Sequence, residues 1–134
     1  VQHYDKKHLF TFGGEHKRFT AGTERVLVNF RGVRILLEVC YYLRFPVWAR
    51  NLGDYDMILY VASWPTPRVD AWSALLRARA IENQCYVAGV NRMGVDPACE
   101  YSGGSAIIDP YGKTIAECPW SRESAVSADI DMEA

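Results

Sequence analysis

The chain has 134 residues, of which 49% are hydrophobic and 23% are charged, and its formal net charge is −1 at pH 7. A chain of this length buries one core and fits a single domain. Its near-neutral charge leaves no basic stripe for nucleic acid, and no apolar run approaches the roughly 18 residues of a membrane span. We therefore expect neither nucleic acid nor a membrane as a partner.

The cysteine pattern favours free thiols. The four cysteines are Cys40, Cys85, Cys99 and Cys118, with no Cys-x-x-Cys pair and no paired histidines at zinc spacing. This spacing argues against a metal site and against a disulfide framework. Reduced thiols in the cytoplasm are the simplest account, so we predict a cytoplasmic protein without a bound metal.

The first third of the chain predicts an irregular segment and then a hairpin. Residues 1–23 read as an extended stretch followed by a long loop. Two β-rich runs at 25–30 and 33–39 are separated by an Arg-Gly pair, which is a good hairpin signal. Residues 46–53 predict a short helix, with proline at its start and glycine at its end.

The remaining elements alternate in type. They are, in order, a strand at 57–62 that is apolar on both faces, a proline-stiffened loop at 63–68, a helix at 69–83, a strand at 85–91, a loop at 92–104, a hairpin at 105–108 and 114–117, and a last strand at 124–130. Strands that alternate with helices and end in a hairpin indicate an α/β fold, with helices packed on a mixed sheet.

The helix at 69–83 has the clearest pattern. Trp72, Leu76 and Ala80 share one face at a spacing of four residues, which predicts the buried side. Arg79 and Glu82 are expected to pair on its surface. Glu82 and the following Asn83 are predicted to have structural roles.

Cys40 stands where a predicted buried strand ends. The apolar run before it stops at this thiol, and a polar, aromatic turn and a proline follow. Enzymes place nucleophiles at such an edge, where backbone N–H groups fan out and a pocket forms. The alternative is an inert core thiol, because free cysteine is among the most buried residue types.

A reactive thiolate needs a cation or a base beside it. The candidates that precede Cys40 are His3, Lys6, Lys7, His8, Glu15 and His16. A Cys–His pair is the commonest arrangement, but the sequence assigns no asparagine or aspartate to orient the histidine. Lys6 offers another solution, since its partly apolar neighbours would aim its ammonium at the thiol. The alternative is that the two lysines are solvated surface charges.

Four short segments occur in a fixed order along the chain. They read Tyr-Asp-Lys-Lys-His-Leu-Phe at 4–10, Cys-Tyr-Tyr-Leu-Arg-Phe-Pro at 40–46, Trp-Pro-Thr-Pro-Arg at 64–68 and Ala-Arg-Ala-Ile-Glu-Asn-Gln at 78–84. Together they resemble the nitrilase (carbon–nitrogen hydrolase) superfamily. Within it the chain is most similar to the bacterial omega-amidase branch, which acts on 2-oxoglutaramate and related omega-amides. The similarity runs over residues 1–129.

The resemblance implies part of a four-layer αββα sandwich and a Glu–Lys–Cys triad, with no metal or organic cofactor. Lys6 matches the catalytic lysine, Cys40 the nucleophile, and Glu15 a second glutamate that orients the ammonium. The general-base glutamate of the family lies on a strand well before the lysine. We therefore expect residues 1–134 to be one partial domain that lacks an N-terminal segment, and another segment to follow it. Alone, these residues are expected to be inactive.

The resemblance also implies a pocket for a small-molecule amide. The backbone N–H of Tyr41 would share the oxyanion with Lys6, and the loop holding Trp64 and Arg68 would form the pocket. Arg68 would clamp a substrate carboxylate, although capping or salt-bridging the following helix is an equal alternative. Members of the family commonly dimerise through helices near the nucleophile, so we expect a homo-oligomer.

Tyr42 departs from the family pattern, which usually has aspartate at this position. Arg44 is expected to anchor the turn through a buried pair. If the aspartate normally holds Arg44, its loss leaves a buried cation without its partner, which would destabilise the fold by about 3–5 kcal/mol. Two other functions remain open: a non-catalytic homologue or interaction subunit, and a carbamoyl or nitrile hydrolase of the same superfamily.

Overall fold

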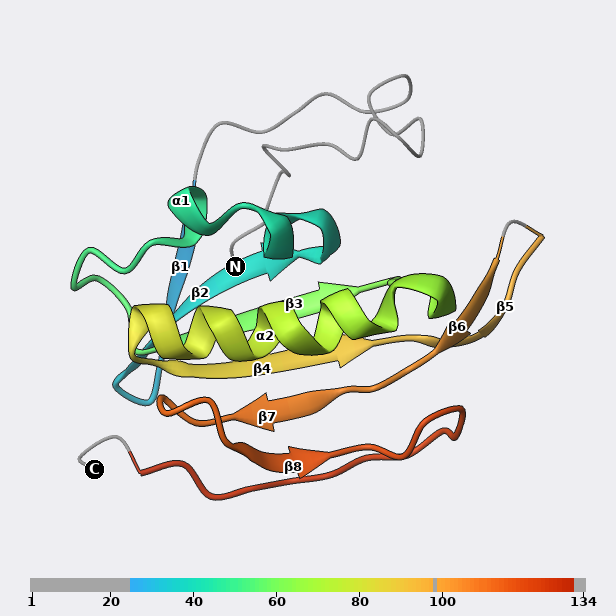
Figure 1. Ribbon diagram of the computed structural model, residues 1–134. Helices are drawn as coiled ribbons and strands as arrows, with labels where there is room; N and C mark the ends of the chain where they lie inside the picture. The colour runs from blue at the N-terminus through green and yellow to red at the C-terminus, as the bar shows by residue number, and fades with distance from the viewer. Residues whose placement is uncertain (1–24, 98, 132–134) are drawn as a thin grey trace.

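The computed structural model describes residues 25–97 and 99–131 of the chain (Figure 1). Six strands form one sheet in the order β1-β2-β3-β4-β7-β8, and two more form a separate ribbon, β5-β6. The strands are β1 (Val26–Phe30), β2 (Val33–Val39), β3 (Met57–Ala62), β4 (Tyr86–Asn91), β5 (Met93–Val95), β6 (Glu100–Ser102), β7 (Ala106–Ile108) and β8 (Thr114–Glu117). The helices are η3 (Cys40–Arg44), α1 (Pro46–Ala49), η4 (Thr66–Arg68) and α2 (Val69–Asn83).

The sheet is mixed, as predicted. Strands β2, β3 and β4 are parallel neighbours, whereas β1, β7 and β8 pair antiparallel with theirs. The β1–β2 hairpin turns at Arg31 and Gly32, whose φ angles of 52° and 83° are both positive, as a type I′ hairpin turn requires. The Asn29 side chain accepts a hydrogen bond from the Gly32 N–H at 3.1 Å and closes this turn.

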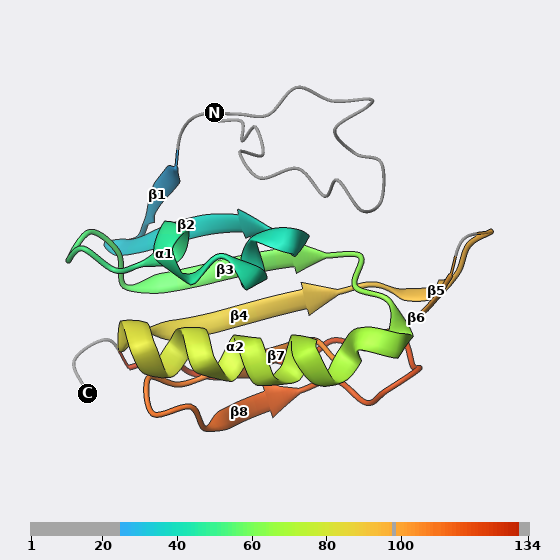
Figure 2. The same ribbon diagram turned by 45° about the horizontal axis from the view of Figure 1, so that its top comes forward.

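Helix α2 covers one face of the sheet, and Figure 2 shows α1 on that same face. Its predicted bounds and buried side are confirmed, since Trp72, Leu76 and Ala80 are all at most 1% exposed. The helix lies close to β4 at Gly89, where an added Cβ would come within 2.8 Å of the Leu76 methyl groups. The core of the described chain therefore lies between α2 and the sheet.

The other face of the sheet is apolar but only partly covered in the described residues. Along β3, Ile58 and Tyr60 are fully buried toward α2, whereas Val61 is 46% exposed. Val90 of β4 is likewise 52% exposed. The described helices thus pack on one face of the sheet, and the second apolar face of β3 and β4 is left partly exposed.

Two predictions about individual elements are wrong, and a third has its end misplaced. Residues 124–130 form no strand, because these mostly exposed residues pair with no neighbouring strand among those described. The predicted loop after β4 instead folds back as the β5–β6 hairpin. Helix α1 ends at Ala49, because Arg50 has an extended backbone with ψ 132°. The Asn51 side chain then accepts from the Gly53 N–H and donates to the Tyr55 carbonyl.

Candidate active site

The carboxyl ends of the three parallel strands meet at one edge of the sheet. Val39 of β2 is paired with Val61 of β3, and Ala62 of β3 with Asn91 of β4. The residues that follow these strands therefore lie beside one another, which is the usual place for a site in an open α/β sheet. Cys40 is one of them, as predicted.

Cys40 has a strained backbone. Its φ angle is 47°, in the left-handed region that residues other than glycine rarely adopt, at a cost on the order of 1–3 kcal/mol. The half-buried thiol donates to the backbone oxygen of Ser63 at an S···O distance of 3.8 Å. A strained turn from strand to helix that presents a nucleophile at the end of a sheet is the arrangement of the nucleophile elbow.

Helix η3 begins at Cys40 itself, so the Tyr41 N–H lies in its first turn, where helical N–H groups have no acceptor within the helix. This position suits the predicted role of the Tyr41 N–H as an oxyanion donor, which stays a prediction. Lys6 and Glu15 lie outside the described residues, as do the three histidines.

Trp64 lies under the site. It is 4% exposed, its ring centroid is 5.7 Å from that of Trp72, and its indole N–H donates to the Arg68 carbonyl at 2.7 Å. The Arg44 guanidinium lies over the Trp64 ring, 5.2 Å from its centroid. The predicted substrate contact of Trp64 stays a prediction, but the exposed group above it is Arg44.

The prediction that Arg44 anchors the turn through a buried pair is wrong. Arg44 is exposed, and a buried residue from α2 holds the turn instead. Arg79 is 4% exposed, and its Nε and Nη2 both donate to the Leu43 carbonyl, at 3.1 and 2.8 Å. Its Nη1 makes the predicted ion pair with Glu82 at 2.9 Å, but only the Glu82 end lies at the surface, with a side chain 42% exposed against 5% for Arg79. No sequence signal separates these two arginines, because their partners are set by packing.

Tyr42 is accommodated without a buried cation. It is fully buried, and its ring meets those of Phe45 and Trp48 edge-on, with centroids 6.5 and 6.4 Å apart. Since Arg44 is exposed, the expected cost of an unpartnered buried cation beside Tyr42 does not arise. An aromatic cluster supports the turn here.

Arg68 is exposed and is the N-cap residue of α2, but its side chain makes no capping hydrogen bond. Arg44, Arg68 and Arg92 all follow the carboxyl ends of strands, so positive charge gathers at this edge. Arg92 lies 4.3 Å from the Tyr101 ring centroid and pairs with Asp96 at 3.5 Å. The role of Arg68 as a carboxylate clamp stays a prediction.

Two buried polar residues near Cys40 were missed. Glu38 is 1% exposed, and burial raises its pKa to about 8, against the opposing charge of Arg25. In the sequence, Glu38 is the single acidic residue within an apolar run, and this was the signal that could have identified it. Asn91, 7% exposed, ends β4 and binds the backbone of Trp64. A polar residue at the end of an apolar strand was its only signal.

Cys85 is buried, unlike Cys40. All four cysteines are free, and burial, together with the charge of Glu82, raises the pKa of Cys85 to about 12. Within residues 25–97 and 99–131, no three histidine, cysteine or acidic side chains gather so as to hold a metal ion. No helix in this part of the chain is long and apolar enough to cross a bilayer.

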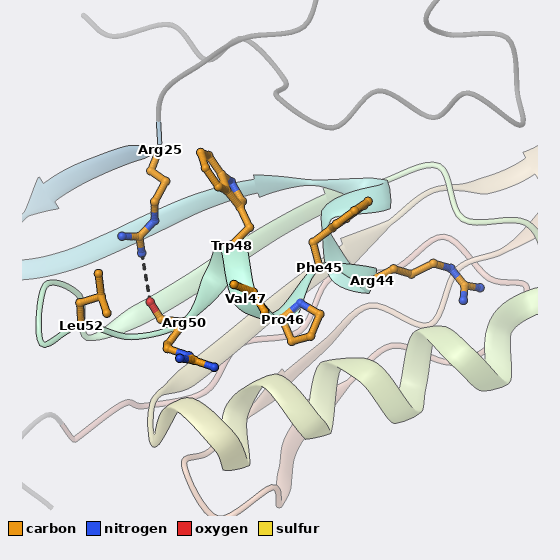
Figure 3. Close-up of a pocket in the computed structure, with 8 residues that line it drawn as sticks. All are labelled: Arg25, Arg44, Phe45, Pro46, Val47, Trp48, Arg50 and Leu52. Atoms are coloured by element: carbon orange, nitrogen blue, oxygen red, sulfur yellow. Dashed lines mark hydrogen bonds between the residues drawn. The ribbon is translucent and has the colours of Figure 1, made fainter.

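A hollow beside α1 lies next to this site but does not contain the thiol. Figure 3 shows Arg25 bound to the Arg50 carbonyl on one side of it, with Arg44 extending away from α1. Its other lining residues are Phe45, Pro46, Val47, Trp48 and Leu52. Cys40 is not among them, so this hollow does not contain the predicted nucleophile.

A thiol at a strained turn, on the carboxyl edge of a mixed α/β sheet, is the arrangement expected of a hydrolase with a cysteine nucleophile. All 134 residues match the carbon-nitrogen hydrolase family, and the chain belongs to this family.

Relatives and solved structures agree with this assignment. The chain is 54% identical to omega-amidase YafV of Escherichia coli strain K12, over 100% of this chain and 53% of that protein. It is 42% identical to 2-oxoglutaramate amidase of Bacillus subtilis, over 99% of this chain and 52% of that protein. The chain also superposes on the structure of XC1258 from Xanthomonas campestris, a CN-hydrolase superfamily protein with an arsenic adduct in its active site. The TM-score is 0.88 at 50% identity, over 92% of this chain and 49% of that one. The chain thus spans about half the length of these proteins.

Proposed function

We propose that the full-length protein is an omega-amidase, which releases ammonia from 2-oxoglutaramate-like omega-amides through a thioester on Cys40. The observation that carries this proposal is the strained φ angle of Cys40 at the carboxyl edge of the sheet. The names of the two amidase relatives support the substrate class. The exposed arginines at the same edge suit a substrate that carries a carboxylate.

The proposed reaction runs in two steps. A glutamate, which we expect before Val1, takes the Cys40 proton, and the thiolate attacks the amide carbon. Lys6, oriented by Glu15, and the Tyr41 N–H hold the negative charge on the carbonyl oxygen; one such donor is worth about 3–4 kcal/mol. The glutamate then gives its proton to the amide nitrogen, so that the C–N bond breaks, ammonia leaves and a thioester remains on Cys40. The same glutamate then activates a water that cleaves the C–S bond, which releases the carboxylic acid and the thiol. The mechanism asks for no metal or organic cofactor.

The wider properties of the protein are proposals too. Residues 1–134 form part of one carbon-nitrogen hydrolase domain, whose remaining layers cover the exposed apolar face of the sheet. We also propose a cytoplasmic homo-oligomer, which size-exclusion chromatography with light scattering would test on the full-length protein.

Ammonia release from 2-oxoglutaramate by the full-length protein tests the proposed reaction. We expect Cys40→Ala to abolish release, because no other group supplies the thioester. Cys118→Ala is the matched control: its thiol also donates to a backbone carbonyl, that of Ser124, at 3.7 Å. Iodoacetamide at low concentration should label Cys40 far faster than Cys99 and Cys118, and far faster than the buried Cys85.

A Cys40→Ala protein that still released ammonia would refute the role of Cys40. No release by the folded wild-type protein would favour the non-catalytic alternative. A panel of omega-amides, N-carbamoyl amino acids and nitriles would identify another member of the superfamily, since these activities share the triad and differ in the pocket.

A further inference from the structure

A buried carboxamide joins two loops beside Cys40. The Oδ1 of Asn91 accepts from the Trp64 N–H at 2.7 Å, and its Nδ2 donates to the carbonyls of Trp64 and Gly103, at 3.1 and 2.7 Å. One side chain thus supplies an acceptor and two donors to three backbone groups. The backbone of Asn91 is held as well, because its N–H donates to the Ser105 hydroxyl at 2.9 Å.

The Trp64 N–H belongs to the same peptide unit as the Ser63 carbonyl. A trans peptide unit is planar, so its N–H and its carbonyl point in opposite directions. On one side of this unit the N–H meets Asn91, and on the other the carbonyl oxygen accepts from the Cys40 thiol at 3.8 Å. The orientation of that carbonyl is therefore coupled to the hydrogen bond that Asn91 makes.

We propose that Asn91 is a positioning residue for the nucleophile, which acts by holding the Ser63–Trp64 peptide unit so that the Ser63 carbonyl faces the Cys40 thiol. This inference rests on the proposed role of Cys40. The carbonyl fixes the direction of the sulfur, and because it accepts a hydrogen bond it favours the thiol over the thiolate until a base takes the proton.

The side chain at position 91 has little freedom to change. Aspartate keeps an oxygen opposite the Trp64 N–H but loses both donors, and glutamine is one methylene longer in a site that is 7% exposed. Leucine has nearly the same shape and makes none of the three bonds. Once these bonds are lost, the Ser63 carbonyl is no longer held against the sulfur, and the loss of an acceptor that favours the thiol favours the thiolate.

The test measures the rate of iodoacetamide alkylation at Cys40 against pH, by mass spectrometry, in the full-length protein. We expect Asn91→Leu to shift the midpoint of this profile to lower pH by about one unit. Asn83→Leu is the matched control. Asn83 is also 7% exposed and binds backbone through the Asn51 N–H and the Arg79 carbonyl, but it lies at the opposite end of the sheet. This control should lower stability and leave the profile in place.

An unchanged profile in folded Asn91→Leu protein would overturn the proposal, and so would an equal shift in Asn83→Leu. If Asn91→Leu fails to fold, Asn91→Asp decides the question. Because it retains an acceptor for the Trp64 N–H, its midpoint should lie at or above that of the wild type, and a fall would overturn the proposal. Alkylation needs no amide substrate, so a protein that released no ammonia but showed the shift would refute the proposed function alone.

Discussion

Replacing Arg79 by methionine tests what holds the turn after Cys40. The guanidinium makes two hydrogen bonds to the Leu43 carbonyl and one to Glu82. The first two share one acceptor and count as one charged hydrogen bond, about 1.5–3 kcal/mol. The pair with Glu82, whose side chain is 42% exposed, adds at most about 1 kcal/mol. We therefore expect Arg79→Met to lower the free energy of unfolding by about 3 kcal/mol.

Urea unfolding of the full-length protein, followed by circular dichroism, measures this loss. Arg77→Met is the matched control on the same helix, because its exposed side chain donates one hydrogen bond to the Gly112 carbonyl at 3.1 Å, and it should cost less than about 1 kcal/mol. Equal losses in the two variants would refute the view that Arg79 anchors the turn. Arg79→Lys keeps the positive charge but lacks the planar guanidinium with its several N–H donors. Its loss of unfolding free energy should therefore lie between those of Arg79→Met and Arg77→Met.

Two further predictions concern Glu38 and Gly89. The folded-state pKa of Glu38, about 8, lies above its ordinary value of 4.5, so the folded state holds a proton that the unfolded state releases, and stability falls as pH rises from 4.5 to 8. In urea unfolding, Glu38→Gln should reduce the loss of unfolding free energy by up to about 1.4 kcal/mol per pH unit over this range. The same pH dependence in the wild type and the variant would contradict the raised pKa of Glu38. Gly89→Ala should cost about 1–3 kcal/mol in the same assay, because its Cβ would meet the Leu76 methyl groups at 2.8 Å. A neutral result would mean that α2 moves away from β4 without penalty.

Local patterns were sufficient for much of the fold. Strands β2, β3 and β8 and helix α2 have the predicted bounds, because each depends on the spacing of apolar residues and on nearby turn residues. The 124–130 prediction was wrong because local β propensity makes a strand only where ladder hydrogen bonds form, and these mostly exposed residues form none with the described strands, although β8 is an edge strand. The β5–β6 hairpin was missed because its three-residue strands are too short to show a period.

At the candidate site, the sequence by itself determined the family and predicted Cys40 as the nucleophile, since both inferences depend on short contiguous segments. Only the tertiary structure decided which arginine holds the turn, and that Asn91 holds the peptide unit beside Cys40. Arg79 and Leu43 are 36 positions apart, and Asn91 and Trp64 are 27 apart. No local pattern reports such contacts, because they form only when packing of α2 and β4 on the sheet brings buried backbone groups to side chains that satisfy their hydrogen bonds.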